Sequence, residues 1–178
     1  MTQGFFFSFE AIYSRQAGIS TSLIGVGIMV GSFSQIPFMV IFDRIYKRFG
    51  LVKLLVCSGM VFGLRWLLYS TVLSSGTILL LWAMHGFNYI IVYLCLIEYV
   101  STNIPKELHT RGQMMNTIIL SGISVIVGSY FGGMISTYIG LRQVFFACAV
   151  VCFLVVPIFL VLSMRLDLYD KCSGKDVK

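Results

Sequence analysis

The stretch of sequence that decides the fold is residues 51–72, which read LVKLLVCSGMVFGLRWLLYSTV. Only Lys53 and Arg65 are charged within it. A helix needs about 20 apolar residues to cross a bilayer, so this stretch predicts a membrane span. Similar runs fill most of the chain, in which 58% of the 178 residues are of the AVILMFWYC type and 11% are charged. Soluble domains carry about 25% charged residues, so the composition argues against a soluble globular protein.

Apolar runs separated by short polar breaks predict an all-α integral membrane protein with five full spans and part of a sixth. The full spans are expected at residues 21–42, 51–72, 77–101, 113–138 and 143–164. The run at residues 1–13 would cover only about 20 Å of a core about 30 Å thick, so we expect a truncated span there. Residues 165–178 form a charged tail that is too short to bury a core. The transmembrane part is therefore residues 1–164, with no separate catalytic domain.

The basic residues predict the orientation, because cytoplasmic loops of membrane proteins are enriched in Lys and Arg. One side of the predicted spans holds only Arg15 and Arg142, and Arg65 falls inside a span. The other side holds the remaining ten: Arg44, Lys47, Arg48, Lys53, Lys106, Arg111, Arg165, Lys171, Lys175 and Lys178. We therefore expect this side, and the C-terminus, to be cytoplasmic. The net charge of +6 then belongs to membrane topology, and no nucleic-acid partner is expected.

Two further patterns describe packing more than chemistry. Glycines recur at four-residue spacing, which allows helices to approach closely; the pairs are Gly27 with Gly31, Gly59 with Gly63, and Gly128 with Gly132. The five cysteines are scattered, with neither a CxxC pair nor a Cys/His cluster. We therefore predict no metal site, no cofactor and no disulfide framework.

Three motifs carry a resemblance to a known family. Residues 43–50 read DRIYKRFG, and Asp43, Arg44, Arg48 and Gly50 stand at the defined positions of a D-R-x-x-x-R-x-G loop. This resembles the cytoplasmic loop between the second and third helices of each half of a major facilitator superfamily transporter. Taken alone it is equally consistent with an ordinary basic loop. Residues 35–37 (QIP) and 105–113 (PKELHTRGQ) resemble an E-I-P motif and a P-x-E-L-R-x-x-x-Q hairpin of the oligosaccharide and phenylpropionate symporter branch, to which lactose permease belongs.

The resemblance implies a fold and a function for residues 10–164. The fold is the C-terminal six-helix half of a major facilitator bundle with its first helix truncated, and the partner is a missing N-terminal half. The function is proton-coupled secondary transport of a small organic solute, such as a sugar or an aromatic acid. Membrane lipid is a further expected partner. Asn88 stands where lactose permease has a Glu after its His, which puts proton coupling in question. The alternative is a half-length membrane protein that does not transport and only assembles with a partner bundle; an enzyme is not expected.

Six residues are candidates for the transport pathway. Arg65 is a charge inside a span, where desolvation costs a few kcal/mol or more, and His85 follows 20 residues later, as in a pair of lactose permease. Both are expected roughly 10 to 12 Å below the outer surface, so antiparallel helices bring them together. Asn88 and Tyr89 flank His85 on one polar helix face. Gln35 and Glu10 complete the set; Glu10 either pairs with Arg65 or faces water. Structural ion pairing, a buried imidazole and interhelical hydrogen bonding remain alternative roles for these residues.

Overall fold

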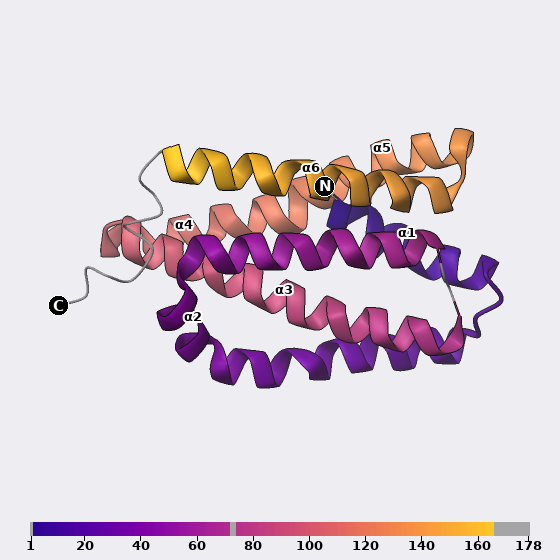
Figure 1. Ribbon diagram of the computed structural model, residues 1–178, viewed down its shortest axis with the longest axis horizontal. Coiled ribbons are helices and arrows are strands. Elements are labelled where there is room, and N and C mark those ends of the chain that lie inside the picture. Colours follow the sequence, from indigo (N-terminus) through magenta and orange to yellow (C-terminus); the bar gives the residue numbers. More distant parts are fainter. Residues whose placement is uncertain (1, 72–73, 166–178) are drawn as a thin grey trace.

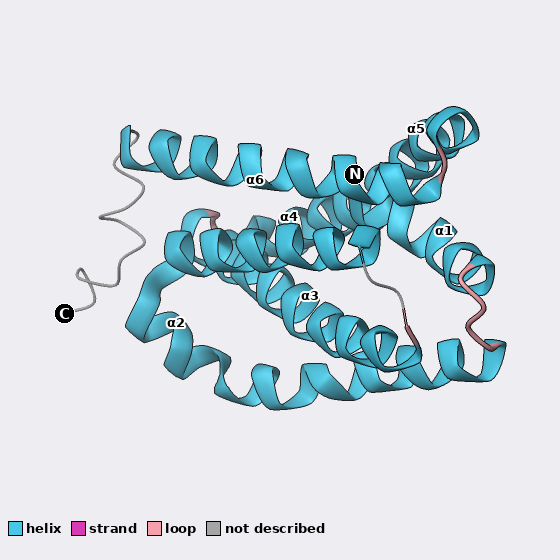
Figure 2. Ribbon diagram, turned by 45° about the vertical axis from the view of Figure 1, so that its right-hand side comes forward, coloured by secondary structure: helices cyan, strands magenta, loops and turns pink. Residues whose placement is uncertain are grey.

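The computed structural model describes residues 2–71 and 74–165, which are helical apart from short connections (Figures 1 and 2). The helices are α1 (Thr2–Gln16), α2 (Thr21–Thr71), α3 (Ser75–Asn103), α4 (His109–Thr117), α5 (Ser124–Ile139) and α6 (Leu141–Arg165). A 3₁₀ turn, η1 (Lys106–Leu108), precedes α4, and a π-helical segment, η2 (Ile118–Ile123), joins α4 to α5. The expectation of an all-α protein is confirmed for the described residues.

Four helical stretches in the described part are long and apolar enough to cross a membrane. They are Thr21–Thr71, Gly76–Asn103, Lys106–Ile139 and Leu141–Ser163. The expected number of six spans is therefore not supported by helix length and composition alone. The difference has two sources: α1 has 15 residues, and the two spans expected at residues 21–42 and 51–72 belong to one 51-residue helix, α2.

The basic segment at residues 43–50 is helical, although the sequence predicted a loop there. It contains no Gly or Pro before its last residue, so nothing in it breaks the helix. The break is Gly50 itself, which has φ 75° and ψ 167°, a conformation adopted essentially by glycine alone. Figure 1 shows that α2 turns back on itself, so that its second part runs beside the centre of the molecule. A single residue therefore separates two helical parts of α2.

The connection between α3 and α4 is also shorter than expected. α3 ends at Asn103, where Pro105 follows closely and cannot continue the helix. The chain resumes as η1 at Lys106 and as α4 at His109. The hairpin motif at residues 105–113 is thus mostly helical, and the helix expected from residue 113 begins earlier.

Helix packing depends on the glycine pairs that the sequence contains. α2 packs against α3 and α6, and α1 packs against α5. A Cβ added at Gly27 or Gly31 would lie within 3.0 Å of Trp82 on α3, and one added at Gly63 would lie 3.0 Å from Phe153 on α6. A Cβ at Gly132 would collide with Phe5 on α1. The prediction of close helix approach is confirmed at these positions.

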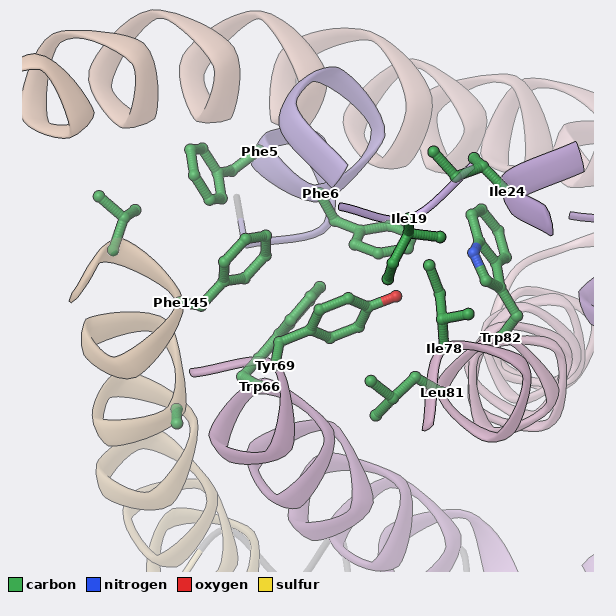
Figure 3. Close-up of a cluster of buried hydrophobic side chains, with 12 residues drawn as sticks. Phe5, Phe6, Ile19, Ile24, Trp66, Tyr69, Ile78, Leu81, Trp82 and Phe145 are labelled. Atoms are coloured by element: carbon green, nitrogen blue, oxygen red, sulfur yellow. The ribbon is translucent and has the colours of Figure 1, made fainter. Parts of the chain in front are cut away.

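An aromatic core joins α1, α2, α3 and α6 (Figure 3). Phe6 lies at its centre, with its ring 5.4 Å from Trp66, 5.6 Å from Tyr69 and 5.2 Å from Trp82. Phe145 of α6 stacks on Tyr69 at 5.2 Å. Because these rings are fully or almost fully buried, they fix the ends of four helices around the polar residues of the candidate site.

Candidate functional site

Arg65 of α2 and His85 of α3 form the centre of the site. Arg65 is fully buried and His85 is 4% exposed, and Nη1 of Arg65 lies 3.0 Å from Nδ1 of His85. An arginine N–H can only donate, so Nδ1 accepts and the imidazole is neutral in this arrangement. The expectation that the two side chains meet across antiparallel helices is confirmed.

The Arg65 guanidinium lies among aromatic rings. Its Cζ is 4.2 Å from the ring centre of Phe6, 4.6 Å from that of Trp66 and 5.6 Å from that of Tyr69. Among the described residues, its Nε and Nη2 have no hydrogen-bond partner. Cation–π attraction is worth up to about 2 kcal/mol when the partners are desolvated. The rings therefore supply much of what stabilises this charge.

A pocket of about 360 Å³ lies beside this pair. We call it the polar pocket. It is formed by α1, the first part of α2, and α3, and it brings together four of the six predicted residues, namely Glu10, Gln35, His85 and Tyr89. Its other lining residues are Phe6, Ala11, Ile28, Gly31, Ser32 and Trp82. Arg65 is not among them, but its guanidinium contacts two residues that are, His85 and Phe6.

Glu10 is held by two donors that the sequence analysis did not connect to it. Its Oε1 accepts hydrogen bonds from Ser14 Oγ at 2.9 Å and from Trp82 Nε1 at 3.2 Å. Glu10 is 3% exposed, so the interpretation that it simply faces water is wrong. The pairing with Ser14 has a sequence signal, because residues four apart share a helix face. The bond from Trp82 has none.

Asn88 lies outside the polar pocket. It is fully buried, and its Oδ1 is 3.4 Å from Ser58 Oγ on the second part of α2. Its Nδ2 has no hydrogen-bond partner among the described residues. The expected single polar face of α3 is therefore divided: His85 and Tyr89 line the pocket, while Asn88 lies in the contact between α3 and α2.

A second pocket, of about 570 Å³, lies on the other side of Tyr89. We call it the apolar pocket. Its wall includes Phe62 of α2, Tyr93 of α3, Ser121 of η2 and Val155 of α6. Tyr89 lines both pockets, and its ring lies between those of His85 at 5.9 Å and Tyr93 at 6.1 Å.

The residues of the loop motif lie on α2, and the described residues hold no candidate metal site. Asp43, Arg44 and Arg48 are exposed on α2 just before its break at Gly50. Within residues 2–71 and 74–165, no three His, Cys, Asp or Glu side chains come close enough to hold a metal ion. The chemistry available in the polar pocket is thus hydrogen bonding, charge and aromatic contact.

Comparison with known proteins assigns this arrangement to a family. The sequence model of the MFS_1-like family matches residues 1–147. The chain belongs to the MFS_1-like family. It is accordingly a transmembrane protein of the major facilitator superfamily, and the resemblance found in the sequence motifs is confirmed.

Curated relatives of this MFS_1-like chain are transporters. It is 25% identical over 138 residues to the uncharacterized transporter YwbF of Bacillus subtilis strain 168, covering 78% of this chain and 35% of the relative. It is 21% identical over 146 residues to a protein of Escherichia coli K12 named "Probable 3-phenylpropionic acid transporter", covering 82% and 38%. It is 22% identical over 156 residues to the maltose permease of Geobacillus stearothermophilus, covering 84% and 39%. The chain thus spans little more than a third of the length of these relatives. No solved structure matches it.

Proposed function

We propose that this chain forms the C-terminal half of a secondary active transporter for a small organic solute, such as a sugar or an aromatic acid, with proton symport. The observation that carries the proposal is the polar pocket. Glu10 of α1 lies together with Gln35 and His85, which belong to two helices that are long and apolar enough to cross a membrane. Because ionisable groups at membrane depth are costly, they mark pathways for solutes and ions. The transporter names of the relatives and the family match support the same conclusion.

The proposed fold is a six-helix half-bundle. A 51-residue helix would be about 77 Å long if straight, more than twice the thickness of the hydrocarbon core. The break at Gly50 allows α2 to cross the membrane twice, once on each side of that residue. α1 is then the end of a truncated first span. The other three spans are α3, the continuous stretch from α4 through η2 to α5, and α6.

The proposed orientation places the break of α2 in the cytoplasm. Arg44, Lys47 and Arg48 lie just before Gly50, where they favour the cytoplasmic side. Arg142 at the start of α6 donates to the carbonyl oxygens of Ser70 and Thr71, so those two helix ends belong to one membrane face. In the proposal that face is the outer one. The tail at residues 165–178 is cytoplasmic, and its residues 166–178 lie outside the described residues.

The proposed partner is an N-terminal half-bundle, against which this half would rock during alternating access. The first part of α2 exposes large apolar side chains, among them Phe33 at 63% and Met39 at 61%. This surface offers an area against which a second bundle can pack. For proton coupling, the proposed groups in the polar pocket are the imidazole of His85 and the carboxylate of Glu10, since the amide of Asn88 does not titrate.

The test is uptake by proteoliposomes that contain this chain together with an N-terminal half-bundle from a relative. Radiolabelled maltose and 3-phenylpropionate are the first solutes to measure, with and without an inward proton gradient. Uptake that needs both halves and increases with the gradient supports the proposal. A well-inserted pair of halves that takes up neither these solutes nor a wider panel contradicts it, and leaves the alternative of a half-length protein without transport.

A further inference from the structure

We propose that the polar pocket takes a hydrogen-bond donor group of the solute, an ammonium or a hydroxyl, against Glu10, and that it disfavours carboxylates. This inference rests on the proposed function and names the chemistry of its solute. Of the solutes proposed for the transporter, it favours a polyol such as a sugar over an aromatic acid, and it adds amines as a further class.

The first argument is the state of the Glu10 carboxylate. Both of its hydrogen bonds reach Oε1, from Ser14 and Trp82. Within the described residues, the charge of Arg65 and the side chain of Tyr69 also act on the carboxylate, but neither residue lines the polar pocket. A buried carboxylate needs donors or a counter-charge. Since Glu10 lines the pocket, a donor group of a solute can add a hydrogen bond to the carboxylate from that side.

The second argument is the position of the nearest cation. Arg65 would attract an anionic solute, but its guanidinium is fully buried and its Cζ lies 4.2 Å from the ring centre of Phe6. Phe6 and His85 line the pocket, whereas Arg65 does not. A carboxylate entering the pocket therefore meets Glu10 before it can reach Arg65. Two carboxylates at close range repel each other.

The third argument is the rest of the pocket wall. Gln35 and Ser32 of α2 add one amide and one hydroxyl, each able to donate and to accept. Phe6, Trp82 and Tyr89 add aromatic rings. Aromatic faces attract ammonium groups through cation–π contact and pack on the apolar face of a sugar ring. Neither partner requires a positive charge from the protein.

The experiment is a binding series that changes only the charge of the probe. The 178-residue chain, reconstituted in nanodiscs of zwitterionic lipid, is titrated at pH 7.5 with phenethylamine, 2-phenylethanol and phenylacetate, and with phenyl β-glucoside as a polyol. Binding is measured as a change in tryptophan fluorescence, to which Trp82 in the pocket wall contributes. We expect the amine or the glucoside to bind about ten- to a hundredfold more tightly than phenylacetate, the range for a charge-assisted hydrogen bond. Whichever of these two probes binds more tightly shows whether the preferred donor group is an ammonium or a hydroxyl.

Matched variants assign the preference to Glu10. Glu10→Gln keeps the size and an acceptor but removes the charge, so it should abolish the preference for donors over phenylacetate. Glu98→Gln, on α3 outside the pocket, should keep it. Equal or tighter binding of phenylacetate, or no binding of any probe, overturns the inference. Donor-selective binding without uptake in the two-half liposomes would instead contradict the proposed transport and leave the inference intact.

Discussion

Nη1 of Arg65 lies 3.0 Å from Nδ1 of His85, although the two residues belong to different helices and both are almost completely buried. This bond joins the second part of α2 to α3 beside the polar pocket. An unpaired guanidinium in such a place would cost several kcal/mol. The neutral imidazole and the surrounding rings lower that cost without neutralising the charge, so Arg65 remains a cation held just behind the pocket wall.

Removal of Arg65 should impair transport more than stability. We expect Arg65→Ala to abolish most uptake by the two-half liposomes, because His85 then loses the donor that orients its ring. Arg65→Lys keeps the charge but not the planar guanidinium, so partial uptake is expected. The measurement is the initial uptake rate, with membrane insertion checked for each variant. Full uptake in a well-inserted Arg65→Ala protein would show that this charge has only a structural role.

Two glycines on the same helix allow a matched test of the pocket wall. A Cβ at Gly27 would lie 2.9 Å from Nε1 of Trp82, whereas a Cβ at Gly25 would meet nothing within 4 Å. Gly27→Ala should therefore displace the indole that donates to Glu10 and lower the free energy of unfolding by about 1 to 3 kcal/mol. Gly25→Ala should be neutral or stabilising by about 0.5 to 1 kcal/mol. Thermal unfolding in nanodiscs measures both, and equal effects would contradict the described contact.

Much of this fold follows from the sequence, because hydrophobicity and glycine spacing act locally. Residues 51–72 predict a span, and the glycine pairs predict close helix contacts, which the structure confirms at Gly27, Gly31 and Gly63. The prediction of a loop at residues 43–50 is wrong, because this segment is helical. Charge and polarity suggested a loop, but a helix ends only where the backbone must leave helical geometry, and that residue is Gly50.

The site was less predictable, because it depends on how helices rotate against one another. Helix depth and a separation of 20 residues were sufficient to bring Arg65 to His85. They do not determine the angular position of Asn88, since packing against Ser58 places it in the contact between α2 and α3. The hydrogen bond from Trp82 to Glu10 joins residues 72 positions apart. No local pattern encodes such a contact.

The different positions of Asn88 and Gln35 predict different phenotypes. Asn88→Ala removes a buried hydrogen bond to Ser58 outside the polar pocket, so it should lower stability by about 1 kcal/mol and leave the KM for uptake nearly unchanged. Gln35→Ala removes a pocket-lining amide that is half-buried, and should raise KM with little effect on thermal unfolding. Uptake kinetics together with thermal unfolding separate the two. A large rise in KM for Asn88→Ala would place it in the pathway after all.

Topology can be tested with impermeant thiol reagents. In a chain that lacks its other cysteines, Cys172 in the basic tail should react only after the cytoplasmic side is opened. A cysteine introduced by Tyr138→Cys, near the end of α5 where the tyrosine is 84% exposed, should react from outside. We choose Tyr138 because Arg142 itself bonds to α2. The opposite labelling pattern would contradict the distribution of basic residues as a guide to orientation.

Gly50 should be sensitive to substitution because of its backbone conformation. Its φ of 75° and ψ of 167° lie in a region where a side chain is strained, at a cost of about 1 to 3 kcal/mol. Gly50→Ala should therefore either destabilise the protein by that amount or straighten α2, which would separate its two parts and move Arg65 away from His85. Gly122→Ala is the control, because Gly122 is helical and its added Cβ would meet only a side-chain atom at 4.0 Å. Unfolding temperature and cross-linking of cysteine pairs between the second part of α2 and α3 distinguish the two outcomes. If Gly50→Ala is as stable as Gly122→Ala and cross-links at the same rate as the unsubstituted protein, the break in α2 does not depend on glycine.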